Sequence, residues 1–214
     1  MGKRAQLSRE RVITAAVALA DAKGVAGVTM RATAAGLGVE AMSLYNHVAG
    51  RDDLLDGMVD AVFAEIDLPA ATGDWKAAMH DRAASAREVL RRHPWAVGLL
   101  DSRTQPGFAT LRHHDAVLGA LRAGGFSVAM AAHAFSVIDA YLYGFVIQEV
   151  SLPFSNEAEL DEVAGEMLRV MPPGEYPHLM ELMTEHALKP GYDYADEFEF
   201  GLSLILDALR PDEG

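Results

Sequence analysis

Apolar residues recur in this chain at helical spacing, and no segment shows the sustained alternation and turn punctuation of β-strands. Gly and Pro interrupt the pattern at intervals and mark where helices end. The predicted fold class is therefore all-α. We expect helices over residues 8–24, 29–36, 40–47, 51–66, 74–92, 95–102, 107–123, 127–151, 157–170, 176–187 and 193–209.

The most apolar of these segments is the run Ala129 to Ile147, AMAAHAFSVIDAYLYGFVI, which approaches the roughly 20 residues of a membrane-spanning helix. His133, Asp139 and flanking acidic residues argue against insertion into a bilayer. Helices that are apolar nearly all round also occur where a bundle or a dimer buries every face. We favour that interpretation and expect no membrane contact.

Charge is distributed unevenly along the chain. Residues 1–51 hold seven Lys and Arg against three Asp and Glu, whereas residues 52–214 hold eleven against twenty-eight. A basic end on an acidic body favours approach to a polyanion in one orientation, although chance clustering of so few charges is the alternative. The absence of Cys excludes disulfides and thiolate zinc sites. The polar first ten residues indicate no export, so we expect a cytoplasmic protein.

The best candidate linker is the stretch PAATG, residues 69–73, because both the helical periodicity and the sign of the charge change near it. We therefore divide the chain into residues 1–50, a connecting helix over 51–68 and a larger unit over 74–214.

Two short helices joined by a tight turn at Gly38 make a helix-turn-helix, whose second helix can enter the DNA major groove. In that second helix, Leu44 and Val48 fall four residues apart and face inward, while polar residues fall on another face. Side chains that can exchange hydrogen bonds with base edges are Glu40, Ser43, Asn46 and His47. An ordinary solvated helix with a polar face would show the same spacing.

The segment TMRATAAGLGVEAMSLYNHVAGRDDLLDGM resembles the N-terminal domain of the tetracycline-repressor (TetR) family of bacterial transcription regulators. The resemblance implies that DNA-contacting positions are Thr29, Arg31, Glu40, Ala41, Ser43, Tyr45, His47 and Arg51. Of these, Tyr45 can reach a phosphate with its hydroxyl, and Thr29, Arg31 and Arg51 begin helices where phosphates run past. Thr33, at a usual core Leu position, and Gly36, late in its helix, depart from the family pattern, and each can loosen the helix.

The larger unit resembles the regulatory domain of the same family. Its long apolar helix and its last helix, FEFGLSLILDALR, look like the elements that form a four-helix bundle between two subunits. The resemblance therefore implies a homodimer, a near-palindromic DNA operator and recognition helices about 34–36 Å apart.

The resemblance also implies a pocket for a small-molecule effector. Carried over by register, its lining positions are Arg82, Ala86, Asp101, Thr104, His114, Val117, Phe135 and Asp139. Trp95 and Phe145 add aromatic surface beside them. The tetracycline repressor has a metal-coordinating His at the position of Asp101 and an aromatic residue at that of Ala86, so tetracycline is not the expected ligand. We expect an amphipathic or aromatic compound with a few polar groups.

Other functions fit the spacing less well. His113 and His114 are adjacent and point to different helix faces, and neither an H-E-x-x-H nor a G-x-S-x-G motif occurs. Asp101 with His114 gives two candidate metal ligands without a third. We therefore expect no enzyme, no metal and no cofactor. A repressor released by an inducer is the favoured function, and a DNA-binding dimer whose larger half is a scaffold without a ligand is the second candidate.

Overall fold

The computed structural model describes residues 6–70, 73–100, 105–172 and 174–212, and every regular element within them is helical. The N-terminal elements are α1 (Arg9–Lys23), the 3-10 turn η1 (Val25–Gly27), α2 (Met30–Leu37), α3 (Ala41–Leu44) and α4 (Arg51–Glu65). The later elements are α5 (Trp75–Arg92), α6 (Pro94–Val97), α7 (Phe108–Ala123), α8 (Val128–Glu149), α9 (Glu157–Val170), α10 (Pro177–Leu182), the π-helical turn η3 (Met183–Ala187) and α11 (Tyr194–Ala208). The predicted all-α fold is confirmed.

Side-chain caps fix where most of the helices begin. The Ser8 hydroxyl accepts a hydrogen bond from the Arg11 amide, and the carboxylate of Asp74 accepts from two amides at the start of α5. Asn156 caps α9 in the same way. Such caps satisfy amide groups that have no partner inside the helix, which is why the sequence located these starts within a residue or two.

Two short helices differ from their expected lengths. The helix expected over residues 40–47 is α-helical only over Ala41–Leu44, because the Tyr45 and His47 amides bond to carbonyls three residues back and tighten the chain into a turn. The helix expected over 95–102 begins at Pro94 and ends at Val97, and residues 101 and 102 lie outside the described part of the chain.

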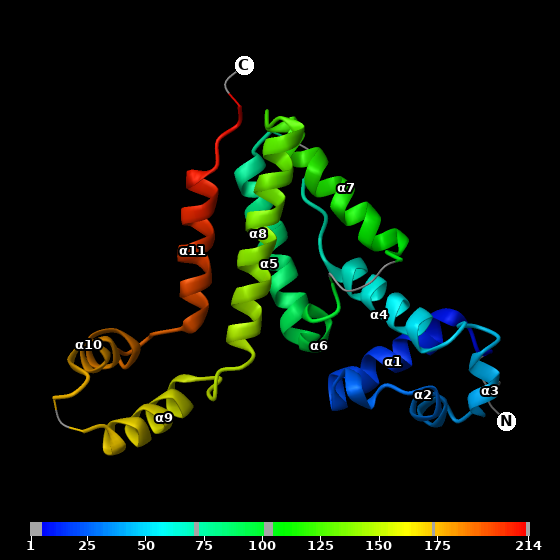
Figure 1. Cartoon of the computed structure of the whole chain (residues 1–214), viewed down its shortest axis with the longest axis horizontal. Helices are drawn as coiled ribbons and strands as arrows, with labels where there is room; N and C mark the ends of the chain where they lie inside the picture. The colour runs from blue at the N-terminus through cyan, green and yellow to red at the C-terminus, as the bar shows by residue number, and fades with distance from the viewer. Residues whose placement is uncertain (1–5, 71–72, 101–104, 173, 213–214) are drawn as a thin grey trace.

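Two hydrophobic cores meet along α4. The N-terminal core contains the α4 residues Leu54, Leu55 and Met58, whereas Val59, Val62, Phe63 and Ile66 belong to the core of the larger unit. Figure 1 shows α4 running from the N-terminal helices at lower right toward the central helices α5, α7 and α8. Helix α4 therefore joins the two units without a loop between them.

The long helix α8 lies at the centre of the larger unit and packs against α5, α7 and α11. By length and composition it could cross a membrane, but its contacts on these sides are those of a core helix in a bundle. The Tyr141 hydroxyl on α8 donates to the carbonyls of Glu197 and Phe198 on α11 at 3.0 Å. Gly201 permits this close approach, because a Cβ there would overlap the Tyr141 ring.

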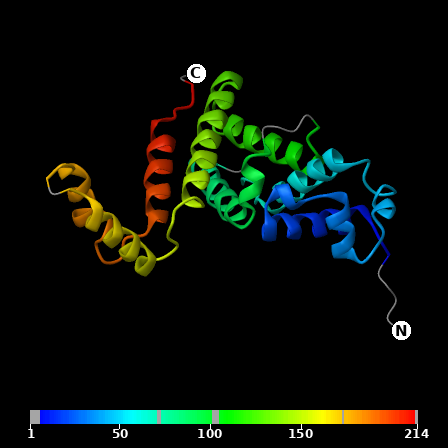
Figure 2. The ribbon, with the colours of Figure 1, turned by 60° about the horizontal axis from the view of Figure 1, so that its bottom comes forward.

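Helices α9 and α10 form an arm that extends away from the central helices, and Figures 1 and 2 show it projecting on the side opposite the N-terminal helices. The arm carries large apolar side chains on its surface, namely Met167, Val170, Tyr176, Leu179, Met180 and Leu182.

Candidate nucleic-acid interface and ligand cavity

Helices α2 and α3 are joined by a tight turn. The Thr29 hydroxyl accepts a hydrogen bond from the Ala32 amide at 3.1 Å and starts α2. Gly38 ends α2 with φ of 66°, in the left-handed region that residues with a Cβ rarely adopt. The sequence thus builds the predicted helix-turn-helix from local signals.

The segment from Glu40 to Val48 is fastened to the N-terminal core on one side only. Leu44 is 0% exposed and Val48 is 2% exposed, whereas Met42 and Tyr45 point outward and are 74% and 47% exposed. Of the other predicted DNA contacts, Glu40, Asn46 and Arg31 are exposed, and Ala41, Ser43 and His47 are half-buried. The buried face holds the segment while the opposite side chains remain available to a partner.

Arg51 lies at the start of α4, as expected, but its guanidinium makes contacts that the sequence did not indicate. Its Nε donates to the carbonyl of Val28 at 3.1 Å, and its Nη2 donates to that of Val25 at 3.3 Å. Arg51 therefore braces the turn before α2 against α4. A phosphate contact by Arg51 stays a prediction.

An ion pair between Arg9 on α1 and Asp53 on α4 holds the C-terminal end of the recognition segment, which is the stretch from Glu40 to Val48. Both oxygens of Asp53 accept from Arg9, at 2.6 and 2.8 Å, and Asp53 also accepts from the Ala49 amide at 2.7 Å. Arg9 reaches the carbonyl of His47 at 3.2 Å as well. The hydrogen bond from Arg9 lowers the pKa of Asp53. Sequence reasoning missed this pair, because residues 44 positions apart give no local signal of contact.

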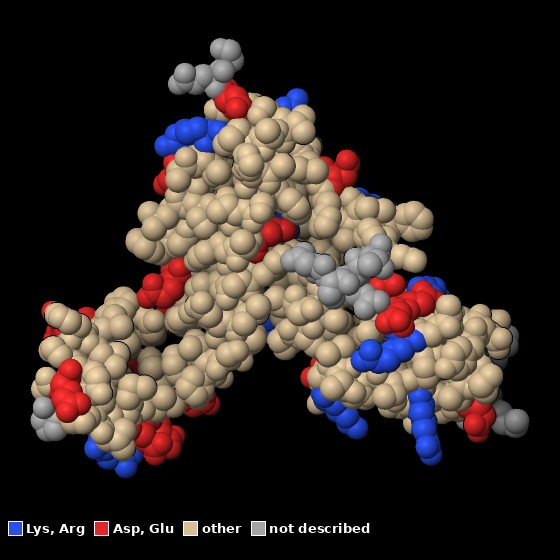
Figure 3. Space-filling model, viewed as in Figure 1, with Lys and Arg blue, Asp and Glu red and all other residues tan. Residues whose placement is uncertain are grey.

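Some basic side chains of the N-terminal helices project from one edge of this unit. Figure 3 shows Lys and Arg projecting from the lower edge of this unit, and others beside acidic side chains on the part that faces the larger unit. A surface of this kind attracts a polyanion such as the DNA backbone.

A cavity of about 240 Å³ lies between α4 and the start of α7. Its lining residues are Asp56, Val59, Leu100, Gln105, Pro106, Gly107, Thr110 and His114. His114 is the one predicted ligand residue among those that line it. The ring of His114 also packs against Phe63 and Phe135, with centroids 5.5 and 5.3 Å away. A ligand in this cavity would touch α4 directly.

Asp60 ties α4 to the first turn of α7 beside this cavity. Its Oδ1 accepts from the Thr110 amide at 2.8 Å and from the Thr110 hydroxyl at 3.0 Å. Gly107 is required there, because a Cβ at that position would overlap the Asp60 carboxylate. Hydrogen bonds as well as packing therefore connect the start of α7 to α4.

A buried polar network lies among α5, α7 and α8. Arg82 Nη1 donates to Asp139 Oδ1, Arg82 Nε donates to His113 Nε2 at 3.1 Å, and the Tyr143 hydroxyl donates to Asp139 Oδ2 at 3.1 Å. Arg82 and His113 are 1% and 0% exposed. Burial, followed by the charges of Arg82 and His114, lowers the pKa of His113 to about 3. The imidazole is therefore neutral at physiological pH.

The remaining predicted ligand residues are dispersed. Ala86 and Val117 are fully packed in the core, while Phe135 is half-buried beside His114. Trp95 packs against both cores, and its Nε1 donates to Asp21 on α1 at 2.6 Å, which makes it a contact between the two units. Asp101 and Thr104 lie outside the described residues. His113 was not predicted as a site residue.

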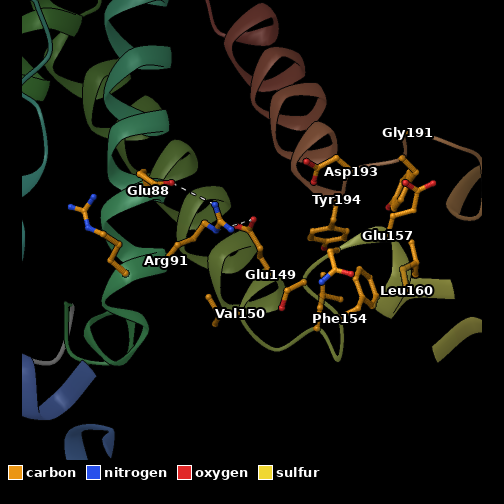
Figure 4. Close-up of a pocket in the computed structure, with 15 residues that line it drawn as sticks. Glu88, Arg91, Glu149, Val150, Phe154, Glu157, Leu160, Gly191, Asp193 and Tyr194 are labelled. Atoms are coloured by element: carbon orange, nitrogen blue, oxygen red, sulfur yellow. Dashed lines mark ion pairs between the residues drawn. The ribbon is translucent and has the colours of Figure 1, made fainter. Parts of the chain in front are cut away.

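A larger groove of about 730 Å³ is bordered by the ends of α5 and α8, by α9 and by the start of α11 (Figure 4). Its charged wall is internally paired, because Arg91 lies 3.3 Å from Glu149 and 3.5 Å from Glu88. Phe154 and Tyr194 line its other side. None of the predicted ligand residues that the structure describes lines this groove, and neither does any residue of α4. In the described parts of the chain, no group of three acidic, His or Cys side chains is arranged to hold a metal ion.

Comparisons with known proteins agree with this arrangement. HTH-type transcriptional repressor DrrR1 of Streptomyces coeruleorubidus is 35% identical, over 98% of this chain and 79% of that protein. The tetracycline repressor protein class A of Escherichia coli is 30% identical, over 95% of this chain and 91% of its own length. The structure of ActR from Streptomyces coelicolor in complex with actinorhodin matches with a TM-score of 0.78 at 25% identity, covering 96% of both chains.

Two family models also match, one ending within α4 and the other beginning just after it. The model of bacterial regulatory proteins of the tetR family matches residues 12–58, and the model of the tetracyclin repressor-like C-terminal domain matches residues 68–211. The second match alone spans more than half of the chain. These matches agree with the helix-turn-helix and the central bundle, and they show that the chain belongs to the TetR family of bacterial transcription regulators.

Proposed function

We propose that this protein is a homodimeric repressor that binds a near-palindromic operator and is released from it by a small-molecule inducer. The observation that carries the proposal is the recognition segment, which is held by Leu44 and Val48 while its polar side chains face outward. Family membership supports it, since curated relatives are named as transcriptional repressors. TetR-family regulators are soluble DNA-binding proteins and not enzymes; we further propose a cytoplasmic location and no catalytic activity.

The proposed DNA contacts are the side chains of the recognition segment and of the helix starts beside it. Glu40, Ser43, Asn46 and His47 would exchange hydrogen bonds with base edges, with Ala41 against the bases. Thr29, Arg31, Tyr45 and Arg51 would contact phosphates. The Thr29 hydroxyl already caps α2. It would therefore contact a phosphate while it still accepts the hydrogen bond from the Ala32 amide.

The dimer is proposed to form through α8 and α11. Their outer faces carry the exposed apolar residues Val137, Ile147, Phe200 and Leu204. Two such helices from each subunit would bury these faces in a four-helix bundle. A twofold axis through that bundle would set the two recognition segments about 34–36 Å apart on successive major grooves.

The inducer is proposed to act at the cavity between α4 and α7. A ligand can shift an equilibrium only by binding one of two states better. An inducer that displaces α4 through Asp60 and the cavity wall would favour a separation of the recognition segments that does not match the operator. In this scheme the DNA-reading unit is residues 1–50, the helix that carries the displacement is residues 51–68, and the ligand-sensing unit is residues 74–214.

The chemistry of the inducer is narrowed by the residues around the cavity. His114 lines the cavity and packs against Phe63 and Phe135, and Asp56, Gln105 and Thr110 supply polar groups in its lining. An amphipathic or aromatic compound fits such a lining. ActR, the structural neighbour described above, was solved with actinorhodin bound. In the alternative function, the larger unit is a scaffold for dimerisation and binds no effector.

The first test is fluorescence anisotropy on the DNA immediately upstream of the protein's own coding sequence, with random duplex as the control. We expect saturable binding of two subunits per palindrome that weakens with salt. If no preference over random DNA is found there, selection from a random duplex library replaces the upstream DNA. Failure of that selection would refute the DNA-binding proposal.

The contact assignment is tested by combining Arg31→Ala with Tyr45→Phe. Loss of the two phosphate contacts should weaken operator binding about tenfold or more. The slope of log affinity against log salt should fall by about one for each Arg31 removed, because only the charged contact displaces counterions. Arg169→Ala, which removes an exposed charge from the arm, is the matched control and should leave both quantities unchanged. Sedimentation should report a dimer for all three proteins, and unchanged operator affinity in the double variant would contradict the assignment.

A further inference from the structure

The recognition segment, Glu40 to Val48, exposes a large apolar side chain that none of the proposed DNA contacts uses. This side chain is Met42, which is 74% exposed. Among residues 6–65, the other large hydrophobic side chain that is exposed is Tyr45, and it belongs to the same segment. The N-terminal unit therefore exposes its large apolar side chains only where DNA is proposed to lie.

Met42 occupies the outermost position of α3. An α-helix turns by about 100° per residue, so side chains two positions apart project in nearly opposite directions. Leu44, two residues after Met42 in α3, is fully buried in the N-terminal core. Met42 therefore projects away from that core and into any groove that receives this segment, while the half-buried Ala41 and Ser43 lie at its flanks.

The chemistry of methionine restricts what this side chain can read on a base edge. Its thioether is at most a weak acceptor and donates no hydrogen bond, so it gains little from the polar groups of the bases. In the major groove of unmodified DNA, the apolar group that a base edge presents is the C5 methyl of thymine. A long, flexible and polarisable side chain adapts well to such a partner. Packing the two together removes apolar surface of both from water.

We propose that Met42 is a specificity-determining residue that packs against a thymine C5 methyl in each half-site of the operator. This inference rests on the proposed operator binding and names a base that the operator must contain. Because the proposed dimer is twofold symmetric, the thymine recurs at the equivalent position of both half-sites. Ser43, Asn46 and His47 keep their hydrogen-bonding roles, so the segment combines an apolar contact at its outermost point with polar contacts around it.

The test removes the methyl group from the DNA and leaves the hydrogen-bonding groups of the base in place. Deoxyuridine in a duplex differs from thymidine by the C5 methyl alone. Each symmetry-related pair of thymines in the operator is replaced by deoxyuridine in turn, and fluorescence anisotropy gives the dissociation constant of the full-length protein. At one pair the native protein should bind the uracil duplex about fifteenfold more weakly, because each buried methyl contributes a factor of about four.

Substitutions at Met42 show which side chain senses that methyl. Met42→Ala should bring the ratio of thymine to uracil affinity at this pair toward one. Met42→Leu keeps an apolar side chain of similar volume and should retain most of the ratio. Since Met42 is exposed, both variants should keep the native circular dichroism spectrum and sediment as the native protein does.

Met167→Ala is the matched control, because it truncates an exposed methionine of the arm. It should leave the ratio at its native value. Methyl groups sensed by other side chains should give the same ratio in every variant. A ratio that changes with residue 42 cannot arise from altered stiffness of the DNA, because every protein is measured on the same two duplexes.

Three results would overturn the proposal and leave the repressor function standing. The first is an operator that has no thymine at equivalent positions of its two half-sites. The second is a native affinity that changes by less than about twofold at every replaced pair. The third is a methyl effect that Met42→Ala leaves intact at every pair. Failure to obtain any operator belongs to the earlier DNA assay, which contains no deoxyuridine, so failure of the thymine contact and failure of DNA binding are distinguishable.

Discussion

Buried polar side chains are rare in the N-terminal unit, which extends to the middle of α4, and more frequent in the larger unit that follows. In the N-terminal unit, Thr33 is the one polar side chain classed as buried among the described residues, whereas the larger unit buries Arg82, His93, Thr110, His113 and Asp139. The first unit needs a stable apolar core and an exposed reading surface. The second buries polar groups that form hydrogen bonds with other side chains. Substitutions of the same residue type in the two units test this difference.

The largest expected effect comes from the two arginines, Arg82 and Arg31. Arg82→Met leaves the carboxylate of Asp139 buried without its partner and should lower the free energy of unfolding by about 3–5 kcal/mol. Arg31→Met, on the exposed surface of α2, should change it by less than about 0.5 kcal/mol. Urea denaturation measures both. Adding Asp139→Leu to Arg82→Met should restore most of the loss, and equal effects of the two single substitutions would remove the contrast between the units.

Acidification is expected to act through His113. Its pKa is about 3 in the folded protein and about 6.5 when unfolded, so the unfolded chain takes up a proton that the folded chain excludes. The stability due to this residue is complete above pH 6.5 and is lost as the pH falls toward 3. Between pH 6.5 and 5 the loss should be about 2 kcal/mol. His113→Phe should flatten this part of the stability curve, and an unchanged slope would show that the ring is not excluded from protonation.

The two buried threonines should respond with opposite signs. The Thr33 hydroxyl has no hydrogen-bond partner among the described residues, so Thr33→Val should raise the free energy of unfolding by about 1 kcal/mol. The Thr110 hydroxyl donates to Asp60, so Thr110→Val should lower it by about 1 kcal/mol. Hydrogen exchange of the α2 amides and urea denaturation measure the two changes. A loss of stability in Thr33→Val would mean that its hydroxyl has a partner after all.

The smallest expected effect concerns the glycines of α2. A Cβ at Gly36 meets nothing within 4 Å, so Gly36→Ala should stabilise the helix by up to about 1 kcal/mol. Gly38 has open space as well, but its φ of 66° disfavours any Cβ, so Gly38→Ala should destabilise the turn. Thermal melts of the two variants should therefore shift in opposite directions. A shift of both in the same direction would contradict the local conformations of α2 and its turn.

Local signals account for what the sequence predicted well. Ser8, Thr29, Asn156 and Gly38 each fix a helix end through their own backbone and nearest neighbours, so the fold class and most helix limits followed from short stretches. The reading surface was also predictable, because Leu44 and Val48 distinguish its buried face. Whether each outward residue touches DNA stays a prediction.

Contacts between distant residues account for what the sequence did not predict. Arg9 with Asp53, Asp60 with Thr110 and Trp95 with Asp21 join positions 44, 50 and 74 residues apart. No periodicity encodes such a meeting, since it depends on how whole helices cross. For that reason Trp95 was placed in the ligand pocket while the structure puts its indole against α1, and His113 was overlooked beside His114.

Helix α4 contributes to the N-terminal core as far as Met58 and to the other core from Val59 onward. A protein engineer who wishes to graft a new sensor onto this DNA reader therefore finds no loop at the boundary between the two cores. A junction at residue 50 would remove Leu54, Leu55 and Met58 from the core of the DNA reader. A junction after Ile66 would instead place the second half of α4 against a new sensor whose core did not evolve to pack against it. The two units can therefore be exchanged only at a point inside α4, near Met58 and Val59, where a single helical turn packs into both hydrophobic cores.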